Sequence, residues 1–221
     1  MFTALDQWVT QGVEPPPSRV PKLSDGTLQP PLPQSGMGFP SIPGVTYTGL
    51  KTTRYLLNYG ASFHTTGIPT FNPPDNATST GPFSAPYEDN PNNGPIYPTF
   101  IPKTDADGND IAGVRLPRVS VPLATYTGWG LRSGVWANDG CESSGQFIPF
   151  AKTKADRLAS GDPRLSAEER YGTFGNYSFA VKMAVTKMIA DRLLLLEDSG
   201  SVSGDALTLG SQMLPLTPTS N

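Results

Sequence analysis

The sequence has few side chains that could act as the base in nucleophilic catalysis. A serine or cysteine nucleophile needs a base within reach, usually a histidine, and the chain has one histidine, His64, and one cysteine, Cys141. His64 lies in GASFHTTGIP and Cys141 in GCESSG, and neither segment matches the G-x-S-x-G nucleophile elbow. No cationic side chain near Cys141 in the sequence favours its thiolate. We therefore predict no catalytic residue in this chain.

The segment DADGND could bind a metal ion. A calcium loop has oxygen ligands at positions 1, 3 and 5, glycine at position 6 and glutamate at position 12. Asp105, Asp107 and Asn109 fit the first three ligands, but position 6 is Asp110 and position 12 is Leu116. We therefore predict a turn without metal and keep the three fitting residues as a weak alternative. Phosphate-loop and dinucleotide fingerprints are missing, so no cofactor is expected.

The segment TYTGWGLR has side chains suited to lining a pocket. Trp129 lies between Gly128 and Gly130, so its ring can lie against neighbouring backbone. A large aromatic side chain of this kind buries ~150–250 Å². We predict that Tyr126, Trp129 and Arg132 have a substrate-pocket or structural role and no catalytic one.

A group of charged residues lies at positions 162–170. It consists of Asp162, Arg164, Glu168, Glu169 and Arg170. Carboxylates beside guanidinium groups can serve as an acid–base cluster, but locally paired charges are the more common arrangement. We predict a charge network that orders two helix junctions.

The elements around these residues are short. Asp, Gly and Asn favour a turn at 105–109, and the β-branched or aromatic residues on both sides predict a β-hairpin between 96–102 and 111–116. Residues 13–95 form a Pro- and Gly-rich strap with loops, in which polyproline II packing is favoured over a ligand for a proline-reading domain. One or two short strands are expected within 45–59.

Helices are predicted at both ends of the chain. Residues 1–12 show an amphipathic face of Phe2, Leu5, Trp8 and Val9. In the helical part, 147–198, Thr153 caps a helix over 154–160, and Ser166 with Glu169 forms a capping box for a second. Apolar residues at three- and four-residue spacing predict a long helix over roughly 177–196. Residues 199–221 are predicted to form a flexible tail.

Composition limits the class of protein. The ten Phe, eight Tyr and three Trp argue against disorder, whereas 23 Gly and 24 Pro indicate much irregular backbone. A net charge of −3 leaves no basic footprint for nucleic acid. No apolar run reaches the ~18 residues of a membrane span, and no signal peptide is recognisable. A lone cysteine leaves the compartment undecided.

Three segments resemble a known family. They are LDQWVTQGVEPPPSRVPKLSDGTL, DADGNDIAGVRLPRVSVPLATYTGWGLR and FIPFAKTKADRLASGDPRLSAEERYG. In this order they resemble the C-terminal part of large bacterial α/β-hydrolase domain-containing proteins, over roughly residues 1–198. The resemblance implies an esterase-like serine hydrolase, often exported, whose nucleophile elbow lies upstream. None of the family's triad maps onto this chain, and Gly130 stands where the pattern has Asn.

The expected fold is therefore the C-terminal portion of an α/β hydrolase, a loop-rich α+β arrangement with short strands and hairpins. The first functional hypothesis is that 1–198 shapes or covers an active site whose Ser, His and Asp lie in an N-terminal part. The alternative is a non-catalytic structural or interaction module. The expected partner is that N-terminal hydrolase segment, or a second copy through the Phe2, Leu5, Trp8 and Val9 face.

Overall fold

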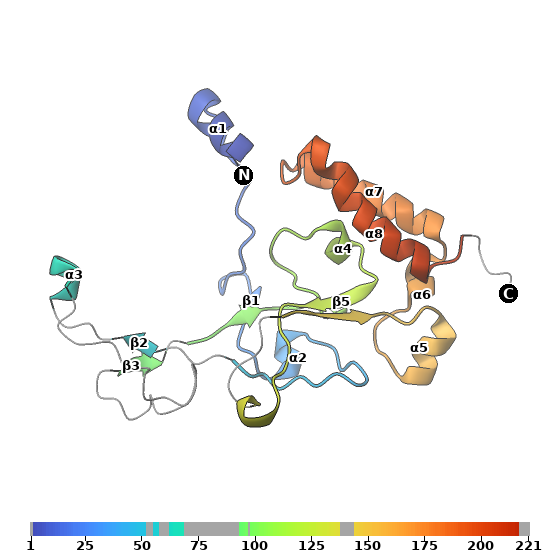
Figure 1. The fold of residues 1–221 in the computed structure, drawn as a ribbon, viewed down its shortest axis with the longest axis horizontal. Coiled ribbons are helices and arrows are strands. Elements are labelled where there is room, and N and C mark those ends of the chain that lie inside the picture. Colours follow the sequence, from blue (N-terminus) through green and yellow to red (C-terminus); the bar gives the residue numbers. More distant parts are fainter. Residues whose placement is uncertain are drawn as a thin grey trace.

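The computed structural model describes residues 2–51, 55–57, 62–68, 93–96, 98–137 and 144–216. The α-helices in these ranges are α1 (Phe2–Gln11), α2 (Gln34–Met37), α3 (Phe63–Thr66), α4 (Pro117–Ser120), α5 (Lys154–Ser160), α6 (Ala167–Tyr171), α7 (Phe174–Ala190) and α8 (Ser199–Met213). Short 3-10 turns occur at η3 (Gly134–Trp136) and η4 (Leu196–Asp198). Figure 1 shows α7 and α8 side by side, with β1 and β5 near the centre of the view and β2 and β3 further to the left.

The strands form separate two-stranded antiparallel ladders. They are β1 (Leu28–Gln29) with β4 (Ile101–Pro102), β2 (Tyr55–Leu57) with β3 (Asn93–Ile96), and β5 (Ala124–Thr127) with β6 (Gln146–Pro149). All pairings among the described residues are antiparallel. This agrees with the expected loop-rich α+β fold with short strands (Figure 1).

The turn predicted at 105–109 forms, but the two predicted strands on either side of it do not form a hairpin. The turn itself closes, through an isolated bridge between Thr104 and Asp110 and a 3.0 Å hydrogen bond from the N–H of Ile111 to the carbonyl oxygen of Lys103. Its first arm, however, pairs with β1, and the second arm runs as a loop. The strap supplies partners for both arms, since the N–H of Gly113 also donates to a strap carbonyl at 2.7 Å.

The two local helix starts are confirmed. The hydroxyl of Thr153 accepts the N–H of Asp156 at 3.1 Å and caps α5. Ser166 and Glu169 form the predicted capping box of α6. Both signals depend only on residues three positions apart, which is why the sequence could reveal them.

The long helix is shifted from its predicted range. The hydroxyl of Thr173 accepts the N–H of Asn176 and starts α7 earlier, at Phe174. The helix ends at Ala190, before Arg192, whose φ of 58° is left-handed. The guanidinium of Arg192 donates to the Glu14 carbonyl and to the Gln7 side chain, at 2.8 and 2.7 Å. The chain beyond the end of α7 is therefore bound to residues near the N-terminus.

The prediction of a flexible tail from residue 199 is wrong for Ser199–Met213, which form α8. Its small residues, which resemble a frayed tail in the sequence, allow close packing against α7. A Cβ atom on Gly210 would lie 2.4 Å from a ring carbon of Tyr177, so only glycine fits there. Ala206 is fully buried, and its carbonyl oxygen accepts the Tyr177 hydroxyl at 3.2 Å.

The core lies where these two helices meet the segment before β5. Its buried members are Val121, Leu123, Ala167, Tyr177, Val181, Ala206, Met213 and Leu214. The segment turns through α4, because Pro117 fixes φ at a first helical position. α1 forms as predicted, but none of its residues is buried. None of the described helices combines the length and apolar character needed to cross a bilayer.

A buried ion pair lies behind the ladder of β5 and β6. The side chains of Arg164 and Asp162 are 2% and 9% exposed, and their closest N···O distance is 2.6 Å. The remaining guanidinium hydrogens bind the carbonyl oxygens of Ile148 and Pro149 and the Thr125 hydroxyl. Burial favours the neutral acid, but hydrogen bonds from Arg164 outweigh it and lower the pKa of Asp162.

Asp162→Ala should lower the free energy of unfolding by about 3–5 kcal/mol, because it leaves the Arg164 charge buried without its counter-ion. Urea denaturation at neutral pH measures the loss. Asp205→Ala, at an exposed position of α8, is the control and should change stability by less than about 0.5 kcal/mol. Equal effects of the two substitutions would contradict a structural role for the pair.

Candidate functional site

The turn at 105–110 is fixed to β5 through Asn109, which is fully buried. Its amide group donates to the carbonyl oxygen of Ala124 at 3.0 Å and accepts the N–H of Tyr126 at 2.8 Å. Gly108 has a φ of 78°, and a Cβ atom there would lie 2.8 Å from the Thr125 methyl group. The turn therefore lies directly against the strand that carries Tyr126.

The predicted charge cluster is a set of structural pairs. Arg157 binds Glu169 with two hydrogen bonds, at 2.7 and 3.0 Å. Together with hydrogen bonds from Ser166, this pair lowers the pKa of Glu169 to about 2. Arg170 pairs with Asp107 and so connects α6 to the turn. These contacts order the helix junctions, as the sequence predicted.

The weak metal alternative would need ligands that are already engaged. One carboxylate oxygen of Asp105 accepts the N–H groups of Asp107 and Asn109, and the other pairs with Arg115 at 2.7 Å. Asp107 is held by Arg170, and Asn109 by β5. The described residues contain no group of three acidic, His or Cys side chains placed to hold a metal ion. Calcium binding would thus have to break existing pairs, and its absence stays a prediction.

The best candidate for a substrate-side site is a cavity of about 520 Å³ beside β5, called here the aromatic pocket. Its size is within the usual range for small-molecule sites. Apolar atoms line much of it, from Met37, Tyr47, Ile101, Pro102, Tyr126 and Trp129. Polar and charged groups come from Thr48, Lys51, Thr99, Thr104, Asp110 and Thr127.

Trp129 belongs to a cluster of three aromatic rings at this pocket. The ring centroid of Phe39 lies 5.3 Å from Tyr47 and 5.7 Å from Trp129, and the Tyr47 and Trp129 centroids are 6.0 Å apart, edge to face. The Tyr47 hydroxyl donates to the Pro31 carbonyl oxygen at 2.6 Å. The indole is half-buried. The sequence did not single out Phe39 or Tyr47, because both lie in the irregular strap.

Tyr126 is another aromatic residue that lines this pocket. Its ring packs on Phe147, with centroids 5.6 Å apart. Its oxygen is buried and has no hydrogen-bond partner among the described residues. Burial raises the pKa of the phenol, so it stays protonated at neutral pH.

Asp110 is the acidic group of the pocket wall. Part of the residue reaches solvent, yet the surrounding protein withholds water, and this desolvation raises the pKa of its carboxyl group. Repulsion from Asp105 raises the pKa further, and Arg115 opposes the shift. Asp110 is nevertheless an exposed acidic group at the pocket wall.

The remaining predicted residues lie elsewhere. The structure brings Tyr126 and Trp129 to one pocket, but half-buried Arg132 is not among the lining residues. His64 is exposed on α3, where its ring contacts Phe63 at 5.8 Å. Cys141 lies outside the described residues. No hydrogen bond joins His64 to a nucleophile or an acid in the described part of the chain.

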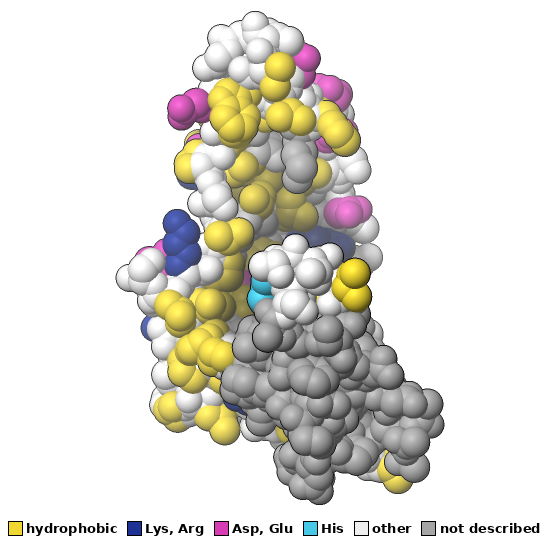
Figure 2. Space-filling model, turned by 90° about the vertical axis from the view of Figure 1, so that its left-hand side faces the viewer, with side chains coloured by type: hydrophobic (Ala, Val, Ile, Leu, Met, Phe, Trp, Pro, Cys, Tyr) yellow, Lys and Arg dark blue, Asp and Glu magenta, His cyan; other side chains and the backbone are white. Residues whose placement is uncertain are grey.

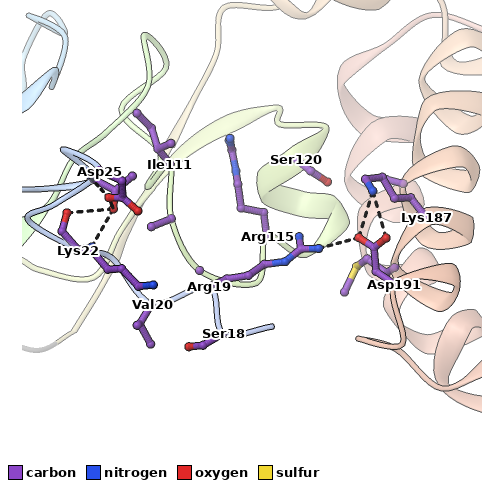
Figure 3. A pocket seen from close by; sticks show the side chains of 15 residues that line it. Ser18, Arg19, Val20, Lys22, Asp25, Ile111, Arg115, Ser120, Lys187 and Asp191 are labelled. Atoms are coloured by element: carbon purple, nitrogen blue, oxygen red, sulfur yellow. Dashed lines mark hydrogen bonds and ion pairs between the residues drawn. The ribbon is translucent and has the colours of Figure 1, made fainter. Parts of the chain in front are cut away.

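A second cavity, of about 450 Å³, lies between the strap, the loop after the turn and α7 (Figure 3). It is called here the charged cavity. Four cationic side chains line it, Arg19, Lys22, Arg115 and Lys187, with two acidic ones, Asp25 and Asp191. These residues are far apart in the sequence, and sequence reasoning missed them because no local pattern joins them.

Trp129→Ala should lower the free energy of unfolding by about 2–3 kcal/mol, less than the ~3–5 kcal/mol of a fully buried ring. The reason is the loss of contacts with Phe39 and Tyr47. Trp8→Ala is the matched control, because Trp8 is 51% exposed on α1, and it should change stability by less than about 1 kcal/mol. A loss below about 1 kcal/mol for Trp129 would instead indicate an exposed binding platform.

Tyr126→Phe should leave the unfolding free energy within about 0.5 kcal/mol or raise it, since the hydroxyl is buried without a partner. Tyr177→Phe removes a buried hydrogen bond to Ala206 and should cost about 1 kcal/mol. Chemical denaturation of both variants makes the comparison. A larger loss for Tyr126 than for Tyr177 would contradict this assignment.

A family model described as alpha/beta hydrolase domain matches residues 1–203. The match covers the aromatic pocket, the turn against β5 and the paired charges behind the ladder. No curated protein and no solved structure matches the chain. Because the match includes nearly all of the sequence and agrees with the resemblance of residues 1–198, the chain belongs to the alpha/beta hydrolase domain family.

Proposed function

We propose that this chain is the C-terminal portion of an esterase-like α/β hydrolase, and that it shapes or covers an active site whose Ser, His and Asp lie outside residues 1–221. The observation that carries the proposal is the aromatic pocket. Aromatic and threonine side chains line much of it, with Lys51 and Asp110 at its wall, in a chain of the hydrolase family. The apolar acyl or alcohol group of an ester would match the aromatic part of this lining.

The placement of the histidine supports a triad supplied by another segment. Acyl transfer through serine requires a nucleophile, a base and donors for the oxyanion. The single histidine is exposed on a four-residue helix and contacts the neighbouring Phe63 ring. Tyr126 and Trp129 would then position substrate beside the catalytic groups without taking part in proton transfer.

The exposed apolar surface of α1 supports the proposal that another segment binds there. Phe2 is 87% exposed and Val9 is 77% exposed, and Leu5 and Trp8 are about half exposed. Figure 2 shows apolar side chains at the end of the molecule where α1 lies and further down the same face. Exposed apolar patches of this kind mark interaction sites. We assign this face to the N-terminal hydrolase segment, or to a second copy of the chain in its absence.

The same exposed surface also favours the alternative function, a non-catalytic interaction module. Sedimentation velocity of the chain alone and of the chain joined to a G-x-S-x-G segment distinguishes the two. If the face binds the hydrolase segment, the joined protein should be monomeric, and Trp8→Asp should lower its activity or its stability. If the face instead binds other partners, it stays exposed in the joined protein, which should then self-associate as the chain alone does.

The chain alone should show no ester hydrolysis, because a serine mechanism lacks its base. Turnover of short-chain nitrophenyl esters measures this, with His64→Ala as the control that should match the unchanged chain. Joined to a G-x-S-x-G segment, the protein should hydrolyse the esters, and Trp129→Ala should raise its KM more than it lowers kcat. Turnover by the chain alone that His64→Ala abolishes would overturn the proposal.

A further inference from the structure

The charged cavity holds two cations against one carboxylate. Arg19 reaches from the strap to Asp191, just beyond the end of α7, with a nitrogen–oxygen distance of 2.7 Å (Figure 3). Lys187 binds the same carboxylate at 3.1 Å. Hydrogen bonds from Arg19 and then Lys187 lower the pKa of Asp191, so it stays anionic at neutral pH. One positive charge here is left without a full counter-charge.

The other charges of the cavity do not supply that counter-charge. Arg115 pairs with Asp105, which is not a lining residue. Asp25 accepts hydrogen bonds from Thr27 and interacts electrostatically with Lys22. Arg115 is therefore paired with an acid outside the cavity, and Asp25 is closer to being the counter-ion of Lys22 than that of Arg19 or Lys187. The Lys187 side chain is 73% exposed and the Arg19 side chain 41%, so an anion from solvent can reach both.

Exposed apolar side chains lie in the same cavity. Val20 is 59% exposed and Ile111 is 40% exposed, and both line the cavity beside its cations (Figure 3). Met188 and Ala184 of α7 add apolar atoms to the wall. A purely ionic ligand would leave Val20 and Ile111 in water, and a purely apolar one would leave the excess cation unpaired. Only a molecule with both parts satisfies the whole lining.

We propose that the charged cavity binds a small amphipathic carboxylate, with its carboxylate at Arg19 and Lys187 and its short apolar chain over Val20 and Ile111. A volume of about 450 Å³ accommodates a small organic acid. The site is distinct from the aromatic pocket, because the two share no lining residue. The inference therefore goes beyond the proposed function and does not rest on it.

Nuclear magnetic resonance titration of the full chain with four probes tests the proposal: hexanoate, acetate, hexan-1-ol and inorganic phosphate. Hexanoate should bind saturably and shift the amide signals of Ala112 and Gly113. It should bind about tenfold more tightly than acetate, since acetate cannot cover the apolar wall. Hexan-1-ol and phosphate should each bind at least about tenfold more weakly than hexanoate, because each offers only one of the two parts.

Two pairs of variants locate the contacts. Lys187→Gln should weaken hexanoate binding about two- to fivefold, whereas Lys182→Gln, an exposed change on the same helix outside the cavity, should leave it unchanged. Val20→Ala should weaken hexanoate binding at least about threefold and leave acetate binding unchanged. Its control is Val135→Ala, because Val135 is 90% exposed and does not line the cavity.

Three results would overturn the proposal. The first is the absence of saturable hexanoate binding in well-folded protein. The second is binding of hexan-1-ol or phosphate as tightly as hexanoate, which would remove the need for one of the two parts. The third is that Lys187→Gln and Val20→Ala both bind hexanoate with the same affinity as the unchanged chain, which would place the ligand elsewhere. Loss of esterase activity in a joined protein has no bearing on any of them.

Discussion

The guanidinium of Arg164 is the interaction on which the centre of this structure depends. It is buried, and it binds Asp162, the carbonyl oxygens of Ile148 and Pro149 and the hydroxyl of Thr125. A buried cation is tolerated only when its hydrogens and its charge are all satisfied. The position of β6, the orientation of β5 and the loop after α5 are therefore fixed together. Loss of any one of these partners weakens the other contacts.

The aromatic pocket depends on that arrangement through β5. Thr125 binds Arg164, and the two residues that follow it on the strand, Tyr126 and Thr127, line the pocket. Asn109 then fixes the turn at 105–110 to the same strand, which places Asp110 on the pocket wall. The strap contributes the opposite side through Tyr47, whose ring packs on Trp129 and whose hydroxyl donates to the Pro31 carbonyl oxygen.

The helix caps were predicted correctly because they depend on nearby residues, whereas the hairpin arms and α8 were not, because distant segments decide their structure. The caps at Thr153 and Ser166 need only a residue three positions away, and both were found in the sequence. The partner of β4 lies more than seventy positions earlier, in the Pro-rich strap, where no periodicity identifies a strand. The fit of Gly210 against Tyr177 likewise depends on two helices meeting, so α8 resembled a tail. Of the residues named for a pocket, Tyr126 and Trp129 line the cavity beside β5 and Arg132 does not, whereas the strap residues of that cavity had no signal in the sequence.

The strap gives both cavities a common element. Residues 18–27 line the charged cavity, and residues from 37 to 51 line the aromatic pocket. Between them the strap is held by the short β1–β4 ladder, and at its start by the Arg19–Asp191 pair. A partly exposed ion pair contributes only ~0–1 kcal/mol, so the strap gains stability from any ligand that contacts it in its ordered form.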